Sequence, residues 1–523
     1  MATAPFIIGC GPLAEVPPPA VIGAKAWHLA RMAALGLPVP PAFVLDTGWC
    51  GAGPGHDREP WMSALAALER ATGLGFADPR GPLLLSVRSG AAVSMPGMME
   101  TVLDIGVNDA TVGGLVRQSG NPRLAWDAYR RLVAGFGEVV LGVPANAFDA
   151  DIAAVAGGVP ERELDFDALR VLTRRHLATV EREAGRAFPQ DPFVQLAMAI
   201  DSVFASWSSA KAVAYRRLHG IDDALGTAVT VQRMVFGNAG GDSGAGVGFT
   251  RHPSTGEPEP WIDFLFNAQG EDVVSGRRSA LGSGELARVA PAVWAALLDA
   301  VQVLEREFCD MQDFEFTVEG GRLWLLQSRA GKRTPQAAAR IALDLLEAGL
   351  IGRAEALQRT AGLDADALAV AELADADGDR PAPLALAQSA CSGVASGEIA
   401  LDETRARERA AAGAAVLLLR RDAETADIGS LEVAAGLLTA RGARTSHAAV
   451  VARQLGRVCL VGCDTLDIDP ASRSVRLGQR LLREGDVLTL DGHRGEVHAG
   501  ALRVRRRADE ALLARLRVLR SLA

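Results

Sequence analysis

A segment rich in aspartate and proline, residues 364–383, interrupts the 523-residue chain and separates two stretches that both carry strand signals. This composition favours a surface linker or hinge over a buried element. A chain of this length also exceeds what one hydrophobic core supports, so about three or four domains are expected. The sequence therefore predicts a multidomain protein with a helical connector and hinge at residues 336–385.

Residues 1–335 contain short apolar runs and one long helical stretch. Because the runs are bounded by glycine, proline or polar residues, strands are expected at residues 42–45, 83–88, 228–235, 246–250, 261–267, 314–318 and 323–327. Between about residues 110 and 225 the apolar spacing is helical, as in Tyr129, Leu132, Val133 and Phe136. We expect a mixed α/β (α/β and α+β) domain with a helical subdomain.

Residues 386–500 form a second predicted unit, with strands at 397–401, 415–419, 436–439, 458–461, 487–490 and 496–497. After it, residues 501–523 predict an arginine-rich amphipathic connector helix in which Leu512, Leu516 and Leu519 share a face. Two interpretations stay open for this helix: a solvated end of the chain, or a surface that docks another protein.

His447 lies where the apolar strand at 436–439 turns into a helix. Gly442 supplies the turn, and Thr445 or Ser446 supplies the N-cap. The unpaired N–H groups and the positive dipole end of the first helical turn attract an anion and disfavour an imidazolium. The motif predicts a neutral, nucleophilic ring whose phosphorylated form the same amides would stabilise. A capped helix with an exposed histidine is the alternative.

Two neighbouring strands predict a polar surface for a metal and a nucleotide. Because side chains alternate along a strand, Asp313 and Glu315 share one face while the phenylalanines beside them enter the core. Gln327 and Arg329 share a face in the same way. If the strands form a hairpin, these groups converge, and they suit Mg²⁺ held by one or two oxygen side chains and nucleotide phosphates. An ordinary strand with a polar outer face is the alternative.

Three further features predict phosphate contacts. A glycine-rich loop that includes Gly244 and Gly246 would let backbone amides approach a phosphate, although no GxxxxGK[ST] motif occurs. Arg88 ends an apolar strand, where a charge must be paired or face a cleft. Lys25 follows Gly23 near a helix start, where a solvated lysine is the alternative.

The charge balance excludes several classes of protein. A net charge of −9 and a pI near 5.5 provide no field that attracts nucleic acid or an anionic membrane. No apolar run reaches the ~18–20 residues of a membrane span. The six scattered cysteines fit reduced thiols better than a disulfide framework. We expect a cytoplasmic protein that binds neither nucleic acid nor membranes.

Taken together, the motifs resemble the pyruvate, phosphate dikinase family over nearly the whole chain. The motifs are SVRSG at 86–90, MPGMM at 95–99, VFGN at 235–238, NAQGEDVV at 267–274, MQD at 311–313, GKRT at 331–334 and TSHAAVVAR at 445–453. The resemblance implies an ATP-grasp nucleotide-binding domain over residues 1–335. It also implies a swivelling β/β/α phosphohistidine domain over residues 386–500.

On this resemblance His447 carries the phosphoryl group. ATP would give its β,γ-pyrophosphoryl group to His447, and inorganic phosphate would remove the terminal phosphate as pyrophosphate. Mg²⁺ would be bound through Glu315 and Gln327, and Thr445 would be a phosphorylation switch, since a second dianion beside His447 would repel incoming phosphates. The resemblance assigns ATP and phosphate binding to Lys25, Arg88, Arg131, Gly244, Gly246, Asp313, Glu315, Gln327 and Arg329.

The chain also departs from the family pattern. Ala443-Arg444 replaces Gly-Met before the histidine motif, Glu100 stands where Asp is usual, and residues 23–28 replace a more glycine-rich sequence. The family's (β/α)₈ barrel, which binds pyruvate and phosphoenolpyruvate, has no counterpart here. We expect the chain to perform the nucleotide half of the reaction, with a separate barrel-bearing protein as partner, docked on the terminal helix; a homo-oligomer is left open.

Two other functions stay open at this point. Transfer to a different acceptor, as in phosphoenolpyruvate synthase or antibiotic phosphotransferases, would not depend on inorganic phosphate. A non-catalytic ATP-binding relic would bind nucleotide without transferring a phosphoryl group. Dependence on inorganic phosphate separates the dikinase reaction from transfer to a different acceptor. Transfer of a labelled phosphoryl group to the protein separates both from a relic.

Overall fold

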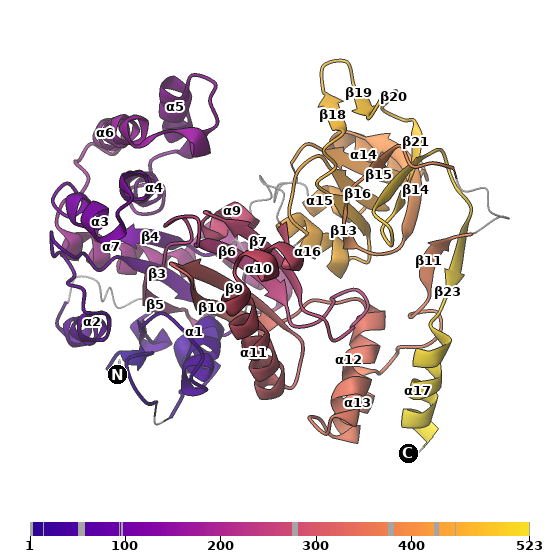
Figure 1. The fold of residues 1–523 in the computed structure, drawn as a ribbon, viewed down its shortest axis with the longest axis horizontal. Coiled ribbons are helices and arrows are strands. Elements are labelled where there is room, and N and C mark those ends of the chain that lie inside the picture. Colours follow the sequence, from indigo (N-terminus) through magenta and orange to yellow (C-terminus); the bar gives the residue numbers. More distant parts are fainter. Residues whose placement is uncertain are drawn as a thin grey trace. The chain divides into compact units, whose positions relative to one another are not determined.

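The computed structural model describes residues 4–521 except 14, 51–57, 94, 96–97, 275–280, 375–380, 423–427 and 445. Figure 1 shows its helices and strands, which divide into two compact units. Unit 1 comprises Met1–Gly241 and Trp324–Ser328, and unit 2 comprises Asp242–Leu323 and Arg329–Ala523. Both units combine helices with sheets, which confirms the predicted mixed α/β, multidomain class.

Unit 1 is built around an antiparallel sheet in the order β1-β2-β5-β3-β4. Its strands are β1 (Phe6–Ile8), β2 (Ala42–Leu45), β3 (Leu85–Gly90), β4 (Thr101–Ile105) and β5 (Ala228–Arg233). β2 coincides with the predicted strand. β2 is buried throughout and β3 at every position but one, because both strands contribute to one hydrophobic core.

Helices connect and cover these strands. They are α1 (Pro19–Ala34), α2 (Glu59–Thr72), α3 (Val112–Ser119), α4 (Pro122–Val139), α5 (Ala145–Ala156), α6 (Phe166–Ala184), α7 (Pro192–Ala205) and α8 (Ala210–His219). α1 packs against β3 and β5, and α7 packs against β3 and β4. In α4, Asn121 caps the helix and Pro122 occupies its first position, as expected for a strong helix start. Its apolar side chains at helical spacing enter the core.

Unit 2 contains a second sheet in the order β10-β9-β6-β7-β8. Its strands are β6 (Gly244–Phe249), β7 (Trp261–Phe266), β8 (Leu281–Gly282), β9 (Gln312–Glu319) and β10 (Arg322–Ala330), and the middle of β10 is counted with unit 1. β6 pairs with both β7 and β9 in antiparallel register. The accompanying helices are α9 (Gly270–Val274), α10 (Ser283–Val289) and α11 (Pro291–Phe308).

Unit 2 also contains an eight-stranded sheet in the order β12-β22-β21-β14-β15-β16-β17-β13. The strands from β14 to β17 in this order run parallel, and the flanking pairs are antiparallel. The bounds are β12 (Ala385–Leu386), β13 (Gln388–Cys391), β14 (Val394–Ala400), β15 (Val416–Arg420), β16 (Gly436–Thr439), β17 (Val458–Val461), β21 (Val487–Asp491) and β22 (Glu496–Ala499). β16 and β17 coincide with predicted strands.

The parallel strands of this sheet are buried on both faces. Leu417 and Leu419 of β15 enter one core, while Leu418 enters another that includes helix α16 (His447–Gln454). The fully buried side chains that α16 is seen to contribute to that core are the alanines Ala448, Ala449 and Ala452, and Val451 packs against it in part, so the helix backbone can approach the sheet closely. The other helices are α14 (Glu403–Ala411) and α15 (Ile428–Leu431). A small sheet of β18 (Leu466–Asp469), β19 (Ser474–Leu477) and β20 (Arg480–Arg483), missed by the sequence analysis, follows β17.

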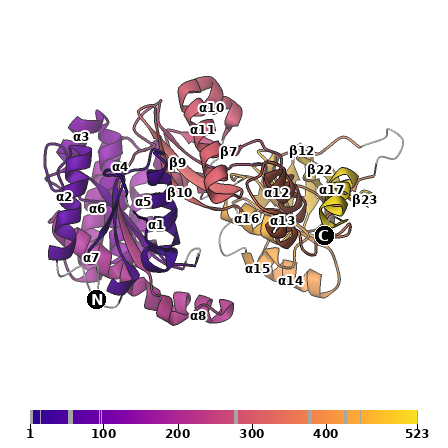
Figure 2. The same ribbon diagram turned by 90° about the horizontal axis from the view of Figure 1, so that it is seen from below.

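The last helix differs from both interpretations of the sequence. α17 (Glu510–Ser521) lies beside α12 (Pro335–Glu347) and α13 (Arg353–Arg359) in both views (Figures 1 and 2). Its leucines, including Leu512, Leu516 and Leu519, are buried in the core formed with these helices. The apolar face is therefore covered by this chain, so it is neither solvated nor available to dock a partner.

A two-stranded ribbon precedes this helix. β11 (Val370–Leu373) pairs with β23 (Val504–Arg507) in antiparallel register. Residues 501–508 are therefore not part of the predicted connector helix. Within the described part of the chain, no helix is long and apolar enough to cross a membrane.

Candidate functional site

His447 begins helix α16, at the corner that the sequence predicts. β16 ends at Thr439, Gly442 takes a φ of +139°, and Ser446 accepts a hydrogen bond from the backbone N–H of Ala449 at 3.4 Å. Ser446 is thus the N-cap and His447 the first helical residue. The positive end of the helix dipole lies at this residue, where an anion is favoured. Thr445 lies outside the described residues.

Arg453, the last residue of the TSHAAVVAR motif, stabilises this corner, a role that the sequence did not predict. It is 1% exposed, and its Nη2 donates to the carbonyl oxygens of Ala390 at 2.7 Å and Arg444 at 3.2 Å. Its guanidinium also lies over the rings of Phe249 and Trp261, at 5.2 and 5.0 Å from their centres. An arginine on the alanine-rich face of a helix was the signal that could have identified it, since a buried charge needs partners.

In unit 1, the end of β3 brings together an arginine and a glutamine. Arg88 is the one residue of β3 that is not fully buried. Its Nη2 lies 3.5 Å from Oε1 of Gln327, a residue of β10 that is 239 positions away in the sequence. The sequence predicts that a cation at this strand end is paired or faces a cleft, and the contact of Arg88 with Gln327 agrees with the first of these.

A close backbone contact places Lys25 beside the same strand end. α1 is broken at Gly23, which has a φ of +77°. A Cβ atom on Gly23 would lie 2.0 Å from the carbonyl oxygen of Gly90, so no other residue fits there. One on Gly90 would lie 3.9 Å from the Cβ of Lys25. The break starts a new helical run just before Lys25, as the sequence predicts.

In unit 2, β9 carries the predicted acidic face. Phe314 and Phe316 are buried in the core, and Asp313 accepts a hydrogen bond from Nε of Arg329 at 2.8 Å. Burial raises the pKa of Asp313, against the effect of the nearby Arg329 charge. Glu315 is partly exposed on the same strand. β9 and β10 are neighbours in the sheet, which confirms the predicted pairing.

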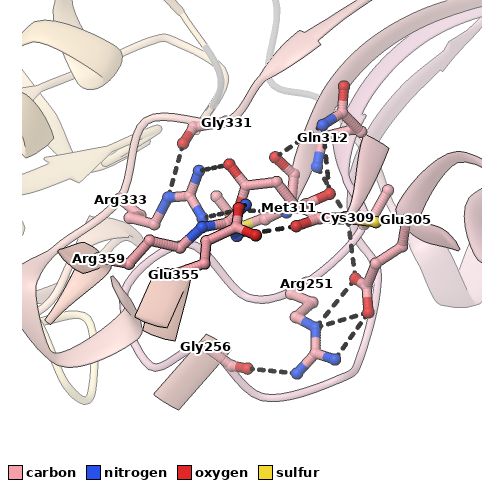
Figure 3. A network of polar contacts seen from close by, with 12 residues as sticks. Arg251, Gly256, Glu305, Cys309, Met311, Gln312, Gly331, Arg333, Glu355 and Arg359 are labelled. Carbon is pink, nitrogen blue, oxygen red and sulfur yellow. Dashed lines mark hydrogen bonds and ion pairs between the residues drawn. The ribbon is translucent and has the colours of Figure 1, made fainter. Parts of the chain in front are cut away.

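A network of ion pairs fixes the start of β9 (Figure 3). Arg251, two residues after the end of β6, donates to both carboxylate oxygens of Glu305 in α11, and to Asp344 in α12 at 2.7 Å. Asp310 is held by Arg333, and Arg359 donates to the carbonyl oxygen of Cys309 at 2.8 Å. Because the chain enters β9 from this anchored turn, the position of Asp313 is set by residues from several elements.

Arg131 lies in α4, and its immediate environment is an ion pair. Its Nε donates to Oδ2 of Asp127 at 2.9 Å, and Arg130 pairs with the same carboxylate at 2.7 Å. Burial opposes ionisation of Asp127, but the charges of Arg131 and Arg130 outweigh it and lower its pKa to about 2. Burial raises the pKa of the neighbouring Asp104 to about 7. Arg131 keeps 24% of its side chain exposed, and its role toward a nucleotide stays a prediction.

Gly244 and Gly246 do not lie in a loop, so the loop prediction is wrong, whereas the strand predicted at residues 246–250 is confirmed by β6. They belong to the buried strand β6, between β7 and β9. A Cβ on Gly244 would lie 2.2 Å from the ring of Phe264, and one on Gly246 would lie 2.3 Å from the ring of Phe316. The glycines make room for aromatic rings on adjacent strands, and this packing is enough to explain why glycine occurs there. Phosphate binding by these residues stays a prediction.

The donor atoms fit the proposed metal, Mg²⁺. Among the described residues, no group of three or more His, Cys, Asp or Glu side chains could hold a metal ion by itself. Mg²⁺ bound to nucleotide phosphates needs only one or two protein oxygens, because phosphates and water complete its coordination. The carboxylate of Glu315 and the amide oxygen of Gln327 are oxygens of this kind.

Comparison with known proteins gives two family matches. Residues 62–280 match the pyruvate phosphate dikinase AMP/ATP-binding domain, and residues 413–495 match the mobile domain of PEP-utilising enzymes. Pyruvate, phosphate dikinase of Rhizobium meliloti is 42% identical over 503 residues, which cover 92% of this chain and 56% of that protein. The Giardia intestinalis pyruvate, phosphate dikinase is 42% identical over 498 residues, with 92% and 56% covered.

The chain is a relative of the pyruvate, phosphate dikinases. It spans about half the length of these relatives, since pyruvate, phosphate dikinase 1 of Arabidopsis thaliana, at 40% identity, is covered over 51% of its length. The AMP/ATP-binding match contains Arg88 and Arg131, and the mobile-domain match contains His447. The resemblance to the pyruvate, phosphate dikinases expected from the motifs is thereby confirmed.

Proposed function

We propose that this chain catalyses the nucleotide half of a dikinase reaction, in which ATP and inorganic phosphate charge His447. The observation that carries the proposal is the start of α16 at His447, behind the Ser446 cap and inside a segment that matches a mobile domain. A histidine at this position carries its phosphoryl group where backbone amides and the helix dipole favour negative charge.

The reaction has two transfers. A ring nitrogen of His447 attacks the β-phosphorus of ATP, the bond to the α-phosphate oxygen breaks, and AMP leaves. An oxygen of inorganic phosphate then attacks the γ-phosphorus, the bond between the γ-phosphorus and the bridging oxygen breaks, and pyrophosphate leaves while the β-phosphoryl group keeps that oxygen and stays on the histidine. Such transfers depend mainly on positioning and on neutralising charge.

Cations of the chain supply this neutralisation in the proposal. Lys25, Arg88 and Arg131 hold nucleotide phosphates, and Arg329 keeps Asp313 oriented toward the nucleotide. The close contact of Gly23 with Gly90 supports the first part, because it fixes Lys25 beside the end of β3. When bound through Glu315 and Gln327, Mg²⁺ neutralises charge on the phosphates.

The finer domain assignment belongs to this proposal. We assign residues 1–335 to an ATP-grasp domain, 336–385 to a connector and hinge, and 386–500 to a swivelling phosphohistidine domain. Pyruvate is the proposed acceptor, because the relatives are named for it, and a barrel-bearing protein would complete the transfer. Thr445 is the proposed phosphorylation switch, and the free cysteines support a cytoplasmic location.

Labelled ATP tests the proposal. Incubation with Mg²⁺, phosphate and ATP labelled at the β-phosphorus is expected to leave an acid-labile, base-stable label on the protein. Label at the γ-phosphorus should leave as pyrophosphate when phosphate is added. His447→Ala should abolish labelling, while His493→Ala, which removes an exposed imidazole from the same unit, should not.

The outcomes separate the alternatives. Persistent labelling in His447→Ala would contradict the assignment of the carrier. Loss of the γ-label from the protein as inorganic phosphate, when no phosphate is added, would favour transfer of the phosphoenolpyruvate synthase type, because water would then take the place of phosphate. Binding of ATP without any label on the unaltered chain would favour a non-catalytic relic.

A further inference from the structure

The turn that leads into His447 is held by an ion pair between Arg444 of the turn and Asp263 of β7, both in unit 2. Arg444 donates from Nε to Oδ1 of Asp263 at 2.9 Å and from Nη2 to the carbonyl oxygen of Ile262 at 3.0 Å. Its guanidinium lies over the ring of Trp261, 4.5 Å from the ring centre. All three partners belong to β7, which lies about 180 residues earlier in the chain.

The surface of β7 that Arg444 contacts is buried. The Asp263 side chain is 1% exposed, and the Arg444 side chain is 20% exposed. An ionised carboxylate buried to this degree needs a cation or hydrogen-bond donors nearby. The neighbouring Ala443 is fully buried in a cluster with Ala245, Val247 and Leu265 from the same β6–β7 surface. The turn before α16 is therefore held on the β6–β7 surface by both apolar contact and an ion pair.

We infer that Arg444 is a positioning residue that latches the His447 turn onto β7 during charging of the histidine. The inference rests on the proposed function, since it concerns the delivery of His447 to the nucleotide-binding part of the chain. Arg444 is three residues before His447, so its contact with β7 fixes where the start of α16 lies on this surface.

An ion pair suits a contact that must also release. Attraction between buried charges is largely offset by the cost of removing both from water, so such a pair fixes a geometry without holding it irreversibly. When the turn leaves, water can solvate both charges.

Single-turnover labelling from β-labelled ATP tests the latch. Arg444→Met is expected to slow charging of His447 about tenfold or more, because Asp263 is left buried without its cation. Arg444→Lys should fall between, since it keeps the charge but loses the paired donors and the planar stacking on Trp261. The dissociation constant for ATP, measured by equilibrium dialysis, should change less than twofold in each variant.

A double-variant cycle separates a latch from a general loss of structure. Arg444→Met combined with Asp263→Asn should be no slower than Arg444→Met alone, since both changes remove the same pair. Arg441→Met is the matched control, because it removes an exposed arginine from the same turn. Charging at the original rate in Arg444→Met would overturn the inference, and so would a loss of ATP affinity that accounts for the slower rate.

Hydrogen exchange tests the latch independently of catalysis. In the full chain, Arg444→Met should speed amide exchange in residues 446–454 and 261–266, and Arg441→Met should not. If the unaltered chain fails to label but shows this difference, the proposed function fails and the latch stands as a docking contact. Unchanged exchange in Arg444→Met would reject the latch whether or not the chain labels.

Discussion

The two units place their polar residues by different means. In unit 1, Gly23 approaches the backbone of Gly90, and this contact between two main chains sets Lys25 beside the end of β3. In unit 2, the space beside Gly246 of β6 is filled chiefly by the ring of Phe316, and the strands packed this way present Asp313. A backbone contact tolerates no added atom, whereas a contact with a ring can be relieved by trimming the ring.

The two units also differ in how their buried carboxylates are paired. In unit 2, Asp263 and Asp313 each accept hydrogen bonds from an arginine. In unit 1, Oδ1 of Asp104 is buried and has no hydrogen-bond partner among the described residues. Burial raises the pKa of Asp104 to about 7, and the charges of Arg131 and Arg130 only partly oppose the rise. Unit 1 therefore contains, beside the ion-paired Asp127, a carboxyl group that gains a proton near neutrality, whereas Asp263 and Asp313 of unit 2 are both ion-paired.

The largest expected effect is at Gly23. Gly23→Ala places a Cβ 2.0 Å from the Gly90 carbonyl oxygen on a backbone with a φ of +77°. The free energy of unfolding of unit 1 should therefore fall by about 4 kcal/mol, or the unit should fail to fold. Gly36→Ala is the control, because Gly36 has a φ of +75° but no atom within 4 Å of the added Cβ. Urea unfolding measures both, and equal losses in the two variants would show that backbone conformation alone sets the cost.

Asp104 should give the next largest effect, and it should depend on pH. Its folded pKa, about 7, lies above the ordinary value of 3.8 for an aspartate, so the folded state holds a proton that the unfolded state releases, and stability falls as pH rises from about 4 to 7. Asp104→Asn removes this dependence and tolerates the φ of +60°. As pH rises from 4 to 8, the free energy of unfolding of the variant should increase by about 2–4 kcal/mol relative to that of the parent.

Urea unfolding at several pH values measures this difference. Asp109→Asn, on an exposed residue of the same unit, should show no comparable gain. A constant difference between Asp104→Asn and the parent across this range would mean that Asp104 titrates normally, and the contrast between the units would be lost.

Gly246 tests whether the crowding in unit 2 can be relieved. Gly246→Ala adds a Cβ 2.3 Å from the Phe316 ring and should cost about 1–3 kcal/mol. Combining it with Phe316→Leu should be less costly than the sum of the two single changes, because the shorter side chain leaves room for the methyl group. Gly241→Ala, where no atom lies within 4 Å, serves as control. Additive costs in the double variant would contradict the ring contact.

The smallest expected effect is at the helix cap. Ser446→Ala removes the side chain that accepts the Ala449 N–H and should cost about 1 kcal/mol, mainly as fraying of α16. Ser446→Asn should restore most of this loss, because Asn caps helices well. Hydrogen exchange of residues 447–450 measures the change. Equal exchange in the serine and alanine forms would show that packing of the helix alanines alone sets the helix start.

Local rules were enough for the predictions at the His447 corner. A strand, a glycine, a serine cap and a helix lie within twenty residues, and each depends on its neighbours in sequence, so β16 and the start of α16 could be read directly. The same holds for β2 and for the alternation of Asp313, Phe314 and Glu315 along β9. These features follow from side-chain periodicity and capping, which need no knowledge of distant residues.

Contacts between distant residues were decided only by the tertiary structure. The sequence could not show that the β6 glycines face phenylalanine rings, since a loop and a crowded strand both select glycine. Nor could it show that α17 buries its leucines against α12 and α13, or that Arg444 meets Asp263 across about 180 residues. The physical reason is that the chemical type of a residue limits which partners it needs, while the packing of remote strands and helices determines which partners it obtains.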